Sequence, residues 1–368
     1  MSKFELSISA DYVSHWGIVE AAREFFQNAL DEQVEDPDNL MFFDYIPEEE
    51  KLLIGNSNSI LDAQTLLFGK TSKADNPKLI GRFGEGYKMA TIVFLRNGKE
   101  VTFYNYASRE IWTTKLVKSR KYKGALVPTF YVNKVAVWDK VPEESLIIEI
   151  KGITAEEYSQ IKESNLHLQD EGVGELYSTS RGRILMDPEY KGKVYVSGLY
   201  VCSNDKLEYG YDFLPEYITL DRDRRVIPDF DLTWSTSKMW TEVNVIGKSL
   251  SYISDTFDGS YTSSFLYGEL ADVVAREFLS EYGLDAVPVS SQDEATRMRK
   301  LGYNPILVTE NRKKVILGAS TFKDNTTIVI KNLYERLLDF IESINDRLDE
   351  DEKSEIQDIL SKSRWLLS

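Results

Sequence analysis

The stretch REFFQNALDE, residues 23–32, has the spacing of an amphipathic helix that carries three polar groups on one stripe. Glu24, Asn28 and Asp31 stand at positions i, i+4 and i+7, so a helix projects all three from the same side. Phe25, Phe26, Ala29 and Leu30 lie around them. Polar groups among such neighbours are either solvated or gathered around a ligand, and the rest of the chain has to distinguish the two.

Composition sets the outer limits. The chain has 368 residues, 42% of them hydrophobic and 12% aromatic, which is typical of a folded protein with two or three domains. Its net charge of −16 argues against binding duplex nucleic acid over a large surface, because phosphates attract positive charge. The basic run KLVKSRKYK, residues 115–123, is more consistent with a solvated loop or strand edge than with a nucleic-acid site.

Cysteine and histidine are scarce. The single cysteine, Cys202, excludes a disulfide framework and a cysteine-based zinc site within one chain, and two histidines, His15 and His167, do not favour histidine-rich metal chemistry.

The first residues contain no long apolar segment, and no apolar run approaches the length of a membrane span. We therefore expect a cytoplasmic location without membrane attachment.

We expect an α+β fold. The first unit should contain a helix capped by Ser14 that runs to Asp31, a strand at 51–55, a helix at 61–68 and a loop at 69–78. A glycine-rich turn then leads into another helix. Four strands and a helix follow, at 100–106, 110–117, 126–132, 145–152 and 154–164.

A second unit is predicted after residue 170. It should contain strands at 181–187, 193–201 and 217–226, a helix at 266–283, and a strand–helix–strand pattern over 286–309. Two amphipathic helices are expected within 327–348 and 353–367. These patterns give predicted domains at 1–170 and 171–325, with a C-terminal helical segment at 326–368.

The motif GRFGEG places Gly81, Gly84 and Gly86 immediately before a predicted helix. Glycines let backbone amides approach an anion, and the positive end of the helix dipole favours it further. Such a pattern alone often marks only a tight turn. No strand directly precedes it, as a dinucleotide-binding fold requires, and the chain has no GxxxxGK[ST] signature.

In this order, the ExxxNxxD helix and the glycine loop resemble the GHKL (Bergerat-fold) ATPases. The closest local likeness is to the microrchidia ATPases and the ninety-kilodalton heat-shock chaperones, through FGKTSK at 68–73 and IGRFGEGYK at 80–88. The likeness is strong over residues 10–155 and extends weakly to about 240 through EYITLDRDR at 216–224. It implies a Bergerat-fold domain, with helices over a mixed sheet, followed by a transducer-like α/β domain and C-terminal helices.

The resemblance also assigns roles. It implies that Glu24 polarises the attacking water, that Asn28 binds Mg²⁺, and that Asp31 lies deeper in an ATP pocket. Arg222 corresponds to an arginine that reaches the γ-phosphate, although a surface ion-pair array with neighbouring aspartates is the alternative. For Lys70 and Lys88 the alternative is a solvent-facing side chain. The expected phosphate-side residues are Lys70, Gly81, Gly84, Glu85, Gly86, Tyr87 and Lys88.

One motif departs from the family pattern. The family binds adenine through the Asp of DxGxG, but the corresponding turn here is GNSNSI, residues 55–60, with Gly55 at the Asp position. Asn56 or Asn58 can substitute, because an amide offers both a donor and an acceptor to a base edge. Thr154 is the candidate for a family Thr behind the pocket, although any Thr that ends a strand would look the same.

Together these observations predict a Mg²⁺-dependent ATPase that uses nucleotide-driven closure or dimerisation to act on a protein partner. The alternative is a degenerate module that binds a nucleotide without turnover. A phosphotransfer kinase is rejected because no separate phospho-acceptor helix is found, and a type II topoisomerase because the chain lacks room for cleavage domains. A homodimer is expected, and the partner protein is not identified.

Overall fold

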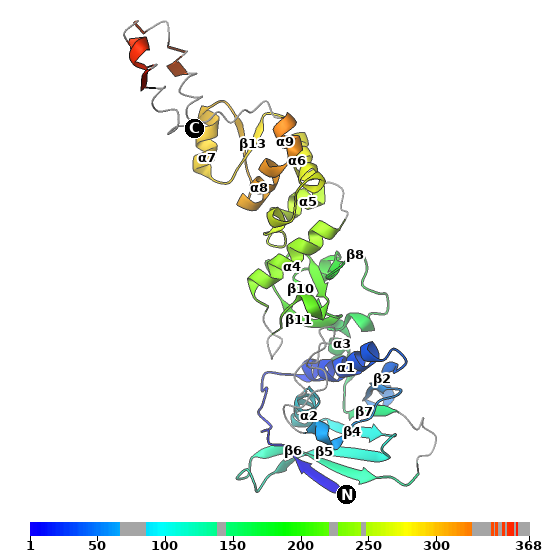
Figure 1. Ribbon diagram of the computed structural model, residues 1–368. Helices are drawn as coiled ribbons and strands as arrows, with labels where there is room; N and C mark the ends of the chain where they lie inside the picture. Colours follow the sequence, from blue (N-terminus) through cyan, green and yellow to red (C-terminus); the bar gives the residue numbers. More distant parts are fainter. Residues whose placement is uncertain are drawn as a thin grey trace. The chain divides into compact units, whose positions relative to one another are not determined.

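The computed structural model describes residues 1–66, 86–137, 145–220, 227–243 and 248–325, together with scattered residues between 340 and 359 (Figure 1). The chain divides into two compact units. One is Met1–Asn244 with Thr256–Tyr261, and the other is Val245–Asp255 with Thr262–Ser368. Both contain strands and helices, so the predicted α+β class is confirmed. The domain boundaries predicted at residues 170 and 325 stay predictions.

A seven-stranded sheet with the order β1-β6-β5-β4-β7-β3-β2 forms the base of the first unit, and every described pairing in it is antiparallel. The four strands predicted after the glycine turn and the strand at 51–55 are confirmed. Two strands were not predicted. Strand β1 has only four residues, and the β2 sequence, MFFDYI, does not alternate polar and apolar residues. The bounds are β1 Ser2–Glu5, β2 Met41–Ile46, β3 Lys51–Asn56, β4 Glu100–Asn105, β5 Glu110–Lys118, β6 Leu126–Lys134 and β7 Leu146–Lys151.

Helices α1, Ile18–Glu35, and α2, Gly86–Arg96, pack on this sheet (Figure 1). The fully buried Phe25 of α1 stacks on Phe94 of α2 with ring centroids 5.6 Å apart, and its edge meets Phe103 of β4 at 5.9 Å. Burying one such ring contributes about 1.5–3 kcal/mol. Because Glu24 is the neighbour of Phe25 on the helix, this packing also fixes where Glu24 lies.

The start of α1 differs from the prediction. Gly17 is the N-cap, not Ser14, and the Glu20 carboxylate accepts the Gly17 N–H at 2.7 Å. The guanidinium of Arg96, at the end of α2, donates to the carbonyls of Tyr12 and Val13, each at 2.9 Å. Those contacts hold the residues before Gly17 in turns, so the helix begins later than its sequence suggests and continues to Glu35.

The first unit also holds α3, Ala155–Glu163, and a mixed five-stranded sheet with the order β11-β10-β12-β9-β8. The single strand predicted at 193–201 is two strands, because Ser197 and Gly198, with φ of 47° and 77°, make a tight hairpin turn. Residues 218–220 of the strand predicted at 217–226 form no strand, and 221–226 lie outside the described residues. The bounds are β8 Leu176–Thr179, β9 Gly182–Leu185, β10 Lys193–Val196, β11 Leu199–Ser203 and β12 Gly210–Phe213.

Helix α4, Asp229–Glu242, lies on the five-stranded sheet, and a buried carboxylate holds the returning segment Thr256–Tyr261 in this unit. Asp258 accepts the hydroxyl hydrogen of Tyr211 and the Glu208 N–H at 2.9 Å, and Trp240 Nε1 donates to the Tyr211 oxygen at 2.8 Å. Burial raises the pKa of the Asp258 carboxyl, and these hydrogen bonds oppose that rise. The network is therefore a polar cross-link between separate stretches of chain.

The second unit contains the predicted strand–helix–strand pattern, with β13 and β14 paired in parallel around α7. The helix predicted at 266–283 is confirmed as α6. Most of the two predicted C-terminal helices lies outside the described residues, and within the described part of the chain no helix is long and apolar enough to cross a membrane. The bounds are α5 Lys248–Ile253, α6 Glu269–Tyr282, β13 Ala286–Val289, α7 Gln292–Lys300, β14 Asn304–Leu307, α8 Glu310–Gly318 and α9 Ser320–Asn325.

Replacing Tyr211 with Phe should destabilise the first unit. The change removes the hydroxyl between Asp258 and Trp240 and leaves a buried carboxylate and a buried indole N–H each short of one hydrogen bond, at about 1–3 kcal/mol for each group. We expect a lower midpoint in urea denaturation followed by tryptophan fluorescence. Tyr267→Phe, at a side chain that is 75% exposed, is the control and should leave the midpoint unchanged. An unchanged midpoint for Tyr211→Phe would show that the network adds no stability.

Candidate active site

Helix α1 turns its polar stripe inward. Glu24 is 3% and Asp31 is 2% exposed, and Asn28 is partly buried between them. A solvated helix face is therefore wrong for these residues, because carboxylates are rarely buried without a partner or a ligand. The prediction that these three residues share one face of a helix is confirmed, because all three belong to α1.

Gly86 brings the start of α2 against this stripe. A Cβ atom at Gly86 would lie 2.7 Å from Glu24 Oε2 and 3.3 Å from Asn28 Nδ2, which is closer than side-chain carbons approach such atoms. A side chain at this position would therefore displace the Glu24 carboxylate and crowd the Asn28 amide, and the backbone φ of Gly86 is not positive. The approach puts a carboxylate and an amide beside a helix N-terminus, where backbone N–H groups favour anions.

Lys88 and Tyr87 follow on α2. Lys88 is fully buried, so the alternative of a solvent-facing lysine is wrong. Tyr87 packs its ring against Phe25 at 5.8 Å and Phe103 at 6.2 Å. Burial, with lesser effects from the nearby Glu32 and Asp31 carboxylates, raises the pKa of the Tyr87 hydroxyl well above 10. The Tyr87 side chain is thus a neutral packing group beside the acids of α1.

Asn56, not Gly55, faces α1 at the end of β3. Its Nδ2 donates to the Ala29 carbonyl at 2.9 Å and to the Asn39 carbonyl at 3.3 Å, so the amide lies under the turn that carries Asn28. A Cβ at Gly55 would lie 2.0 Å from the Leu146 carbonyl oxygen, which leaves no room for any side chain there. The side chain that takes the helix-facing position is therefore the amide of Asn56, one residue after the position assigned to the motif's Asp.

Asn58 contributes through its backbone. Its side chain is exposed, while its N–H donates to Asn39 Oδ1 at 2.8 Å. Asn39 also donates from Nδ2 to Ser59 Oγ at 2.9 Å, and Asn105 of β4 binds the N–H and carbonyl of Leu61 at 3.4 and 2.6 Å. These contacts hold residues 56–61 at the end of the sheet. Sequence reasoning missed Asn39 and Asn105, since no spacing links them to β3.

Thr154 is not brought to this site. In the antiparallel pairing of β3 and β7, Asn56 is opposite Leu146 and Lys51 is opposite Lys151, so Thr154 follows the other end of β7. Its hydroxyl accepts the Glu157 N–H at 3.2 Å and caps α3. In the structure Thr154 is thus the N-cap of α3, a role that the sequence analysis did not predict.

Several predicted site residues lie outside the described residues, namely Lys70, Gly81, Gly84, Glu85 and Arg222. Within the described part of the chain, no group of three His, Cys, Asp or Glu side chains is placed to hold a metal ion. The expected binding of Mg²⁺ by Asn28 stays a prediction, because a magnesium site needs fewer protein ligands than such a group. Mg²⁺ takes one or two protein oxygens and completes its shell with waters and substrate phosphates.

No family model and no curated protein matches the chain. Three solved structures share 11% identity with it. The ATPase region of Saccharomyces cerevisiae topoisomerase II matches with a TM-score of 0.32, and the match covers 50% of this chain and 62% of the topoisomerase chain. The ATPase and transducer domains of Balamuthia mandrillaris topoisomerase II match with a TM-score of 0.31, over 50% of this chain and 60% of theirs. The same yeast ATPase region bound to dexrazoxane matches with a TM-score of 0.34, over 64% of this chain and 70% of the topoisomerase chain.

The chain thus spans about three fifths of the length of the first two topoisomerase structures. Likenesses of this size establish neither a family nor an activity for this chain. The functional interpretation rests instead on the ordered motifs and on the contacts among α1, α2 and β3.

Gly86→Ala tests the close approach of the two helices. The added methyl group should push the Glu24 carboxylate and the Asn28 amide away from α2, while alanine is a better helix former than glycine. We expect ATP turnover to fall at least tenfold with little change in the thermal midpoint. Gly318→Ala in α8 is the matched control, because a Cβ there meets no described atom within 4 Å. Normal turnover in Gly86→Ala would mean that the approach does not matter for activity.

Proposed function

We propose that the chain binds Mg-ATP between α1 and the start of α2 and hydrolyses the γ-phosphate bond. The observation that carries the proposal is the approach of Gly86 to Glu24 and Asn28. It joins the two motifs, with Asn28 and Gly86 58 residues apart in the sequence, into one polar site at a helix N-terminus. ATP hydrolysis needs an oriented water, a divalent cation and donors for the developing charge, and this site offers residues for each.

Each residue has a proposed role. Glu24, buried beside the helix N-terminus, orients the attacking water and accepts its proton. Asn28 supplies a neutral oxygen to Mg²⁺, which when bound neutralises phosphate charge. Lys88 places a buried cation on α2 near the phosphates. Glycine-loop amides are proposed to complete the phosphate contacts, with Gly81, Gly84, Glu85, Gly86, Tyr87 and the lid residue Lys70.

Asn56 is the proposed reader of the base, with Asp31 shaping the polar floor of the pocket. Both described hydrogen bonds of the Asn56 side chain use its nitrogen, which presents the amide oxygen as the acceptor for an adenine amino group. An amide binds such a donor less strongly than a carboxylate does. We therefore expect weaker base selection than in an ATPase that keeps an Asp at this position.

A nucleotide-binding module without turnover is the second candidate. The missing acid favours it, because Gly55 has no room for a side chain and Asn56 carries no charge. The two candidates differ only in whether bound ATP is hydrolysed. Nucleotide-driven closure or homodimerisation, acting on a protein partner, is the proposed output of the ATPase and would appear as an ATP-dependent change in sedimentation.

Isothermal calorimetry and phosphate release test the proposal together. The unaltered chain should bind ATP only with Mg²⁺ present and release phosphate. Glu24→Ala should lose at least a hundredfold in kcat while ATP still binds, because water activation is lost and the phosphate contacts remain. Asn28→Ala should weaken both binding and turnover.

Glu35→Ala, at an exposed position near the end of the same helix, is the control and should behave like the unaltered chain. Absence of Mg²⁺-dependent ATP binding would refute the site. Binding without phosphate release would select the second candidate.

Arg222→Ala tests whether the region after β12 senses the γ-phosphate. An arginine placed against transition-state charge contributes orders of magnitude in rate, whereas ADP lacks the phosphate that it would contact. We expect strongly reduced turnover with ADP affinity within about twofold of the unaltered chain, both measured on the same preparation. Equal losses of ATP and ADP binding, or a normal rate, would assign Arg222 to a surface ion-pair array instead.

A further inference from the structure

Arg23 lies between the proposed catalytic Glu24 and the five-stranded sheet. Its Nη1 donates to the carbonyl oxygen of Tyr200 on β11 at 3.3 Å, and its Nη2 lies 3.5 Å from Glu24 Oε1. The side chains of Arg23 and Glu24 are 10% and 3% exposed, so both groups are largely shielded from water. One guanidinium therefore contacts the candidate active site with one nitrogen and a different sheet with the other.

The partner carbonyl on β11 is held firmly. The Tyr200 N–H donates to the Ser164 carbonyl at 3.0 Å, and the Leu166 N–H donates to the Gly198 carbonyl at 2.8 Å. At the hairpin turn, the Gly198 N–H donates to Asp212 Oδ1 at 2.6 Å. These contacts attach the β10–β11 hairpin to the end of α3, so the position of the Tyr200 oxygen follows the position of the hairpin.

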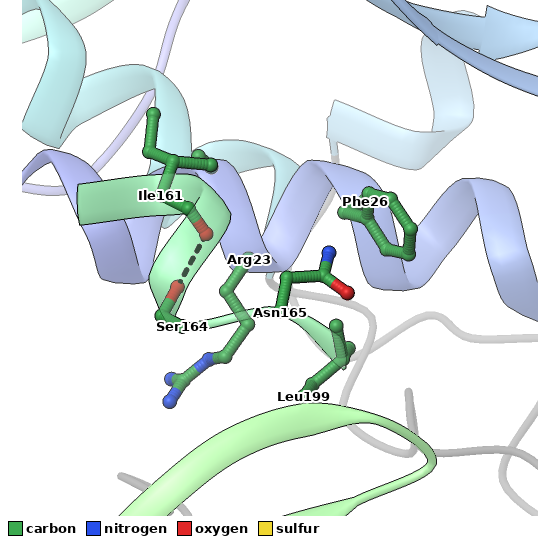
Figure 2. A pocket seen from close by; sticks show the side chains of 7 residues that line it. Arg23, Phe26, Ile161, Ser164, Asn165 and Leu199 are labelled. Atoms are coloured by element: carbon green, nitrogen blue, oxygen red, sulfur yellow. Dashed lines mark hydrogen bonds between the residues drawn. The ribbon is translucent and has the colours of Figure 1, made fainter. Parts of the chain in front are cut away.

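Arg23 lies beside an aromatic ring and lines a small cavity, whose other lining residues Figure 2 shows. The guanidinium lies 5.7 Å from the ring centroid of Trp16. The cavity has a volume of about 10 Å³, with room for about one water and none for a nucleotide. The cavity is lined by Ala22, Arg23, Phe26, Ile161, Ser164, Asn165 and Leu199.

We propose that Arg23 is a positioning residue for Glu24 and couples its carboxylate to the β10–β11 hairpin. The inference rests on the proposed ATPase function and adds the means by which the second sheet affects hydrolysis. With Nη1 held by Tyr200, Nη2 stays beside Glu24 and restrains the rotamer of the carboxylate that orients the water. A shift of the hairpin moves the guanidinium and changes that restraint.

Arginine suits this role because its planar fork presents several N–H donors in fixed directions. A lysine in its place keeps the charge and the aliphatic stem but has a single nitrogen with which to serve Tyr200 and Glu24. A purely structural role for Arg23 predicts lost stability without a selective change in kcat. The positioning role predicts a lower kcat with unchanged nucleotide affinity, which separates the two.

The test uses the full chain with Arg23→Gln and Arg23→Lys. Phosphate release gives kcat and KM for Mg-ATP, and calorimetry gives the Kd for ADP. We expect Arg23→Gln to lower kcat at least tenfold with KM and Kd within twofold, and Arg23→Lys to retain part of the lost rate. In the background of Glu24→Gln, Arg23→Gln should cause no further loss, because the arginine acts through the carboxylate.

Lys206→Gln is the matched control, since Lys206 is a cation with a 60% exposed side chain that pairs with Asp229 away from Glu24. It should leave kcat unchanged. A normal kcat in Arg23→Gln, or equal losses with and without Glu24, overturns the positioning role and leaves the ATPase proposal standing. If Arg23→Gln lowers the thermal midpoint, only Arg23→Lys is compared with the unaltered chain. A kcat of Arg23→Lys equal to that of the unaltered chain then overturns the positioning role. Absence of ATP hydrolysis in the unaltered chain overturns both proposals.

Discussion

The approach of α2 to α1 at Gly86 is the constraint on which the candidate site depends. A Cβ atom at position 86 would lie 2.7 Å from Glu24 Oε2 and 3.3 Å from Asn28 Nδ2, so any residue other than glycine would displace the Glu24 carboxylate and crowd the Asn28 amide. With glycine there, the helix N-terminus, a buried carboxylate and an amide share one small volume. The aromatic packing of Phe25 on Phe94 and Phe103 holds the two helices at that separation, so a core contact sets the geometry of the polar site.

Helix α1 serves both sheets of the first unit. Glu24 and Asn28 lie beside Gly86 of α2, where they form the candidate site. Arg23 reaches the second sheet through the β11 backbone. Phe26 stacks on His167, in the 3-10 helix Leu166–Leu168, with ring centroids 5.6 Å apart. A helix packed on two partners transmits displacement from one to the other, since close-packed interiors do not deform freely. This arrangement gives the proposed coupling a physical route.

Sequence alone determined the features that depend on local pattern. The 3.6-residue period gave the helix with Glu24, Asn28 and Asp31 on one stripe, and two-residue alternation gave the central strands. Both periods follow from backbone geometry within a few residues, so they are readable without tertiary contacts. The glycine spacing likewise indicated where a helix would begin, and α2 begins at Gly86.

Only the tertiary structure decided the features that depend on distant partners. The start of α1 moved from Ser14 to Gly17 because Arg96, about eighty residues away, binds the preceding carbonyls. The sheet register turned Asn56 toward α1 and carried Thr154 to the other end. Arg23 meets Tyr200 across 177 residues of sequence, a contact that no local pattern signals. Such pairings arise when elements pack, because the energy that selects them is burial and hydrogen bonding between segments rather than backbone preference.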